Sequence, residues 1–122
     1  MEYAVVELIK LSQHHRVIAD VSMRLALLTE ISDADRIACL MAPPHMVTCA
    51  QYGAREDHKE FLDCLLSLKE PEKKIAVQDE LFRLDVERIF DEVRQYGLFS
   101  VVREPDSTVE HTIQLLEQHF AL

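Results

Sequence analysis

The sequence predicts an all-α fold: a compact bundle of about five to six helices, with a long N-terminal helix and one short extended or strand segment near residues 98–103. Only two glycines and four prolines occur among 122 residues, and they stand where helices would end. The runs between them carry apolar residues at three- and four-residue steps. The hydrophobic content of 48% supplies one core without disulfides, so we expect residues 1–122 to form a single helical domain.

The first helix is predicted over residues 3–30, which contain neither glycine nor proline. An apolar seam along it is the predicted interaction surface, and it consists of Leu8, Leu11, His15, Ile18, Leu25 and Leu28. A long helix in water gains most of its stability by burying its apolar face, so the seam predicts a partner helix from this chain or a second copy. His15 is either a half-buried ring or a residue that sets the register of a dimer.

A second helix is predicted from Ser32 to about Met41. Ser32 and Asp35 have the spacing of a capping box, in which the serine hydroxyl accepts a hydrogen bond from the backbone N–H three residues on. The helix is expected to end before Pro43, because proline restricts the residue that precedes it.

A short third helix is predicted from Pro44 through Tyr52. Proline suits a first helical turn, where its missing N–H would have no partner. Gly53 is expected to end this helix in a left-handed conformation.

Two longer helices are predicted over residues 55–68 and 75–96, joined by the charged segment 69–74. Apolar residues at helical spacing give each a core-facing side. Oppositely charged residues four apart mark exposed faces of the second one: Asp79 with Arg83, Arg83 with Glu87, and Arg88 with Glu92.

The segment 98–103, LFSVVR, follows Gly97 and is rich in β-branched and aromatic residues, which favours a strand. It either pairs with the same segment of another subunit or packs on helices as extended chain, and the second is favoured because no other strand is expected. A last helix is predicted over 108–120, with Ser107 and Glu110 as its capping box and Val109, Ile113, Leu116 and Phe120 facing inward.

Residues 37–54 carry no Asp, Glu, Lys or Arg, yet they do not suit a membrane span. A span needs about twenty predominantly apolar residues, and here two prolines interrupt the run. A metal site would draw on Cys49, His58 and Cys64, with Cys39 or His45 as a fourth ligand. Structural zinc sites bring ligands in close pairs, and this chain has no Cys pair of that kind. We therefore expect these cysteines to be core residues and expect no metal or other cofactor.

Common catalytic signatures are missing as well. Two glycines, at 53 and 97, make neither a phosphate-cradling loop nor a dinucleotide fingerprint. None of the glutamates has a histidine three residues on, which excludes the di-iron helical pattern. We predict a protein that is not an enzyme and name no catalytic residue.

The net charge of −9 limits the partners. An acidic surface repels phosphate backbones and anionic lipids, so we expect neither membrane nor independent nucleic-acid binding, and a basic or apolar protein partner instead. The odd number of cysteines and an N-terminus without a basic, then apolar, signal sequence predict a cytoplasmic location.

The segment ADRIACLMAPPHMVTCA (34–50), followed by EDH (56–58), resembles the helical hairpin of FlhD, the flagellar master-regulator subunit. In that family a leucine-rich helix precedes a Pro-x-Met-Val helix, matched here by Met46 and Val47. The resemblance implies a hairpin of two helices and a dimeric transcription-regulator subunit. On that reading Arg16, Arg24 and Arg36 would need to share one face to contact DNA.

The sequence thus favours a non-enzymatic helical protein-interaction module, such as an adaptor, a chaperone-like binder or a regulatory subunit. We expect it to be a homodimer through the first helix. The transcription-regulator subunit and a Cys/His metal-binding protein are the alternatives.

Overall fold

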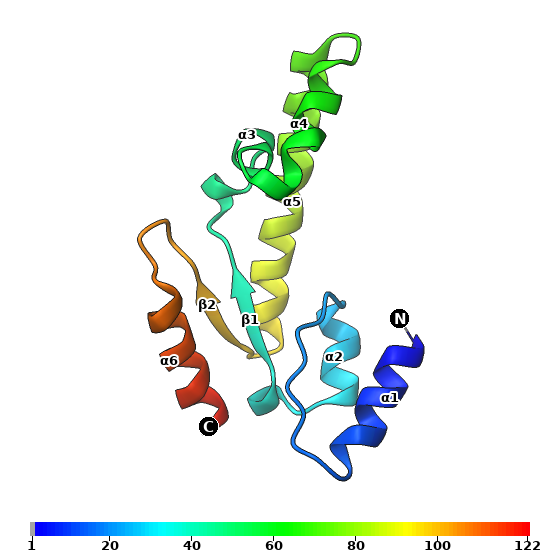
Figure 1. The fold of residues 1–122 in the computed structure, drawn as a ribbon, viewed down its shortest axis with the longest axis vertical. Coiled ribbons are helices and arrows are strands. Elements are labelled where there is room, and N and C mark those ends of the chain that lie inside the picture. Colours follow the sequence, from blue (N-terminus) through cyan, green and yellow to red (C-terminus); the bar gives the residue numbers. More distant parts are fainter. Residues whose placement is uncertain (1) are drawn as a thin grey trace.

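The computed structural model describes residues 2–122, and they are mostly helical (Figure 1). Six α-helices occur in this range: α1 (Glu2–Ser12), α2 (Leu25–Ile31), α3 (Cys49–Gly53), α4 (Lys59–Leu66), α5 (Pro71–Gln95) and α6 (Val109–Phe120). Three 3₁₀ turns, η1 (Ala34–Arg36), η2 (Pro44–Met46) and η3 (Glu56–His58), and two strands, β1 (Ala38–Met41) and β2 (Phe99–Val102), complete the described elements. The mostly helical character and the strand within 98–103 are confirmed. The all-α class is wrong, and so are both arrangements expected for that strand, because β2 pairs with β1 of the same chain.

The two strands pair in parallel, with Ala38 opposite Phe99 and Met41 opposite Val102. The predicted helix over residues 32–41 is therefore wrong, because Ala38–Met41 is a strand. The predicted capping box is not used either: Ser32 is the extended C-cap of α2, and its N–H donates to the Leu28 carbonyl. A short apolar run suits a buried strand as well as a buried helix, and β2 supplies the partner that decides it.

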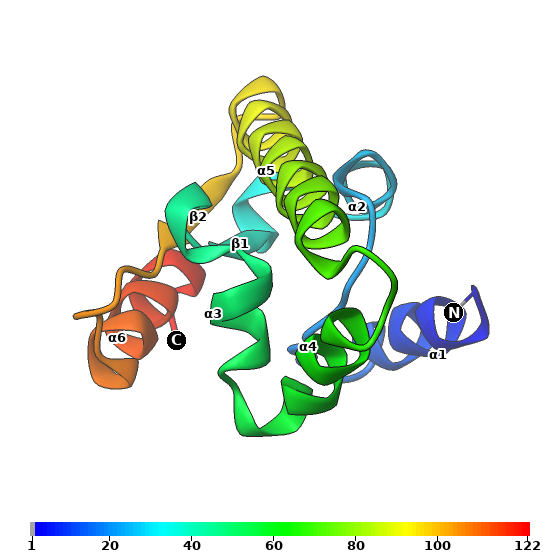
Figure 2. The ribbon, with the colours of Figure 1, turned by 90° about the horizontal axis from the view of Figure 1, so that it is seen from above.

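Helices cover both faces of this sheet (Figures 1 and 2). Alternate residues of a strand point to opposite faces. On one face Ile37, Cys39 and Met41 join Val93 of α5 and Leu98 in the buried core. Leu25, Leu28, Ile89, Phe90 and Tyr96 pack around that core. On the other face the Phe99 ring stacks on His119 of α6, with centroids 4.2 Å apart.

Helix α6 is fixed to the sheet by its last turn. His119 Nε2 lies 3.0 Å from the Ile37 carbonyl oxygen. The cap predicted at Ser107 is instead at Thr108, whose hydroxyl accepts from the His111 N–H at 3.1 Å.

The inward face predicted for α6 is partly wrong. Thr112 is buried, whereas Val109 and Ile113 are 59% and 48% exposed. Leu116 and Phe120 are half-buried, as their predicted inward position requires.

The longest helix, α5, forms an antiparallel hairpin with α4 that projects from the sheet (Figure 1). Its 25 residues span about 37 Å. It begins at Pro71, earlier than predicted, and is followed by Gly97, which adopts the left-handed φ of +62°. An aromatic cluster fills the space between α3, α4 and α5, and its members are Tyr52, His58, Phe61 and Phe82.

Gly53 has a different role from the one predicted. It lies within α3, and the left-handed φ expected there is absent from this glycine. A Cβ at this position would clash with Leu62 of α4. Gly53 thus allows α3 and α4 to pack closely, and the third helix starts only at Cys49, with Thr48 as its N-cap.

The continuous helix predicted over residues 3–30 is wrong. α1 ends at Ser12, and an irregular connection over residues 13–24 leads to α2. The Ser12 hydroxyl donates to the Ile9 carbonyl at 2.7 Å, and the N–H of His15 donates to the Leu11 carbonyl at 2.9 Å. These bonds close the last turn, and the β-branched residues that follow favour extended backbone over helix: Val17, Ile18 and Val21.

Candidate functional site

Helix α1 presents apolar side chains around most of its circumference, and few of them are covered. Tyr3 is 89% exposed, Leu11 50%, Val6 47% and Ile9 43%. Its polar side is narrow and includes an ion pair, Lys10 Nζ to Glu7 Oε1 at 2.9 Å. A helix that is apolar nearly all round is normally buried.

The position of α1 explains this exposure. It lies at one edge of the molecule beyond the connection 13–24, away from the sheet in both views (Figures 1 and 2). No residue of α1 belongs to the buried core of the described chain. An isolated helix of 11 residues is marginal in water, so α1 requires a covering surface.

The predicted interaction residues do not share one helix face. Leu8 and Leu11 lie on α1, where Leu8 is half-buried, and His15 and the 70% exposed Ile18 lie in the connection. The half-buried ring predicted for His15 is wrong, because this residue is exposed and lies outside the helix. Leu25 and Leu28 lie on α2 and pack against the core. Of the predicted seam, only Leu8 and Leu11 therefore stand on a common, largely uncovered helix.

A second apolar surface, which we call the α5 stripe, consists of Val77, Leu81 and Leu84. They are 62%, 54% and 49% exposed. Their spacing of four and then three residues places them on one side of the helix, away from Phe82 and Val93, which face the interior. This stripe was not predicted from the sequence, although its helical spacing is visible there.

Ion pairs border the α5 stripe. Arg83 binds Glu80 at 2.6 Å and Glu87 at 2.5 Å, so the pair predicted with Glu87 is confirmed. The side-chain hydrogen bond from Arg83 holds the pKa of Glu80 below its usual value. The predicted partner of Arg83, Asp79, instead faces α3.

The candidate metal ligands lie in different environments. Cys49 is fully buried at the start of α3, and its thiol lies 3.9 Å from the Ile75 carbonyl oxygen. Burial, and then the neighbouring Asp79, raise the pKa of Cys49 to about 11. Cys64 is exposed, which corrects its predicted core position, and the His58 ring stacks on Tyr52 at 4.1 Å. Among residues 2–122 no group of three or more His, Cys, Asp and Glu side chains is arranged to hold a metal ion.

The other predicted core thiol, Cys39, is buried in β1, and this burial raises its pKa. Within the described chain no helix is both long and apolar enough to cross a membrane.

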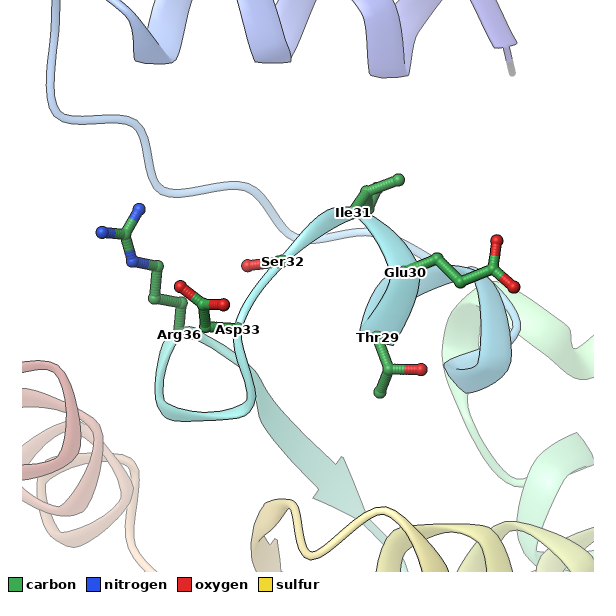
Figure 3. A pocket seen from close by; sticks show the side chains of 6 residues that line it. All are labelled: Thr29, Glu30, Ile31, Ser32, Asp33 and Arg36. Atoms are coloured by element: carbon green, nitrogen blue, oxygen red, sulfur yellow. The ribbon is translucent and has the colours of Figure 1, made fainter.

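The described surface includes two shallow depressions. One, of about 210 Å³, is lined by Thr29, Glu30, Ile31, Ser32, Asp33 and Arg36. Their side chains point in different directions rather than toward a common point (Figure 3). The other, of about 380 Å³, is lined by Pro44, Glu87, Phe90, Asp91 and Arg94. Catalysis needs polar groups that converge on reacting atoms, so the first depression offers no candidate catalytic site.

The arginines that a DNA contact would need come from three segments. Arg16 lies in the connection 13–24, Arg24 is the N-cap of α2, and Arg36 lies in η1. The helical hairpin that the FlhD resemblance implies is also wrong, since the segment 34–50 contains β1.

No protein-family model, no curated protein and no solved structure matches the chain.

Proposed function

We propose that this chain is a non-enzymatic protein-interaction module that forms a homodimer through α1. One observation carries the proposal: the chain exposes 9395 Å². A compact monomer of 14.1 kDa exposes about 6,700 Å², so roughly 2,700 Å² is in excess. A large obligate homodimer interface buries about 1,000 to 2,500 Å² per subunit, so the excess is slightly larger than the upper end of this range.

The side chains give the same indication. Only seven hydrophobic residues are buried, whereas 18 large hydrophobic side chains are exposed among the described residues. Each buried Val, Leu or Ile contributes about 1.5–3 kcal/mol, so a core this small leaves the fold short of stabilisation until further apolar surface is covered.

Helix α1 suits a second copy because the charged pair in its middle is neutral. Glu7 and Lys10 neutralise each other within the helix. Two copies of α1 can therefore approach with their apolar sides together and no net repulsion between these residues. Leu8 and Leu11 would lie at the centre of such an interface.

Light scattering after size-exclusion chromatography tests the proposal over a range of protein concentrations. We expect a dimer whose mass is unchanged by reductant or chelator. Leu11→Glu should convert it to a monomer, and Lys10→Gln, which makes the same change in net charge on the polar side of α1, should leave it dimeric.

A monomer at every concentration would overturn the homodimer. A dimer lost on reduction or chelation would instead place the cysteines and histidines in the interface. No residue of α1 belongs to the core, so both variants should fold. Circular dichroism verifies this.

A further inference from the structure

The α5 stripe has the sequence geometry of a helix-packing seam. Residues 77, 81 and 84 follow the alternating four- and three-residue steps by which one helix packs against another. In this frame Glu80 and Glu87 line one margin of the stripe, and Asp85 and Glu92 line the other. Arg88 occupies the seam position that follows Leu84, and Lys73, on the first margin, is paired with Glu70.

These margins keep a negative surplus. Arg88 binds Asp85 and Glu92, each at 2.7 Å, and Arg83 binds Glu80 and Glu87. Four carboxylates thus share two guanidinium groups. Both arginines form ion pairs within α5, so neither is available to pair with an acidic side chain of a partner.

A second copy of α5 is a poor occupant of the stripe. Two such helices would place the acidic margins of both copies against each other, and like charges at these positions oppose pairing. A helix with lysine or arginine at its margins meets the opposite charge and keeps the apolar contact.

We propose that Val77, Leu81 and Leu84, with their acidic margins, form the docking site for a basic amphipathic helix of a partner protein. This inference rests on the proposed function as an interaction module but uses a surface other than α1. Leucine-like side chains of the partner would cover the stripe, and its basic margins would pair with carboxylates of α5.

Two synthetic helical peptides test the site on the intact 122-residue chain. Both carry leucine at the seam positions, and they differ only in having lysine or glutamate at the margins. By fluorescence anisotropy we expect the lysine peptide to bind at least about tenfold more tightly than the glutamate peptide, and to weaken as salt is added.

Matched protein variants locate the binding. Leu81→Gln should reduce affinity for the lysine peptide by about tenfold or more, whereas Leu66→Gln on α4, where Leu66 is 53% exposed against 54% for Leu81, should not. Glu87→Lys should weaken binding and Glu104→Lys, off the stripe, should not. Equal binding of both peptides, no binding of the lysine peptide, or an unaffected Leu81→Gln variant would overturn the proposal.

Two variants distinguish the dimer interface from the peptide site. Leu11→Glu should abolish the dimer and leave peptide binding intact, whereas Leu81→Gln should weaken peptide binding and leave the dimer intact. If Leu81→Gln instead produced a monomer, the stripe would be occupied by a second copy, and the basic partner helix would be excluded.

Discussion

The backbone N–H of Cys49 donates a 2.7 Å hydrogen bond to the carboxylate of Asp79, which joins the start of α3 to α5. The first N–H groups of a helix have no partner within the helix. Cys49 is fully buried, so water does not supply one either. Asp79 therefore caps α3 from a distant part of the chain, and it fixes how the hairpin sits against the segment that leaves β1.

Removing this carboxylate should destabilise the fold. Asp79→Ala leaves the Cys49 N–H buried without an acceptor, which costs about 1–3 kcal/mol. Asp79→Asn keeps an acceptor oxygen and should lose less. Urea unfolding measures both, and Glu80→Ala, at an exposed ion pair, should change the free energy of unfolding by less than about 0.5 kcal/mol. Equal losses for the alanine variants at 79 and 80 would contradict the capping role.

Alkaline pH should destabilise the fold through Cys49. The pKa of its thiol is about 11 in the folded chain, against an ordinary value of 9.0. Above pH 9 the unfolded chain releases a proton that the folded chain retains, so the free energy of unfolding falls between pH 9 and 11. Cys39, whose pKa burial also raises, contributes with the same sign.

Melting temperatures over pH 7–11 measure this effect. Cys49→Ala should flatten the decline above pH 9, and Cys64→Ala, at an exposed thiol, should leave the decline as it is. An unchanged slope in Cys49→Ala would refute the assignment.

Gly53→Ala should destabilise the contact between α3 and α4. The added methyl group clashes with Leu62, and overpacking of this kind costs about 1–3 kcal/mol. In a Leu62→Gly background the same substitution should cost less, because glycine lacks the Leu62 Cβ, the atom nearest to the added methyl group. The four proteins form a double-mutant cycle in urea unfolding, and strict additivity would show that the clash with Leu62 is not the cause.

Sequence alone was sufficient for the elements whose signals are local. α5 was predicted because a long apolar period is followed by Gly97, and β2 because LFSVVR is rich in β-branched and aromatic residues. β1 was missed because ACLM is too short for its period to separate strand from helix, and its partner is distant in sequence. The break after Ser12 was not predicted, because the helical spacing of apolar residues continues through residues 13–24. In the structure no other element covers an apolar face there.

The residues of the candidate site were likewise predicted only in part. The helical placement of Leu8 and Leu11 was predicted because their spacing is helical, and α1 has that helix. The α5 stripe was not predicted, because oppositely charged residues four apart are typical of a solvated helix face. Burial decides between these interpretations, and only the arrangement of α2, α4 and the sheet around α5 determines which of its sides remains uncovered.

Amide exchange in α1 should depend on protein concentration if a second copy covers it. Alone, an 11-residue helix outside the core opens readily, so its amides exchange fast in dilute protein. Dimerisation should slow the exchange of residues 3–12 as concentration rises, while α5 near Val93, buried within the monomer, should exchange at a rate that changes far less.

Mass spectrometry of exchanged peptides resolves the two helices in one experiment, and Leu11→Glu is its control, since that variant should exchange fast in α1 at every concentration. Protection of α1 that is equal in dilute and concentrated samples would mean that the helix is covered within its own chain. The excess surface would then have to be buried elsewhere, and the α5 stripe would be the first surface to examine.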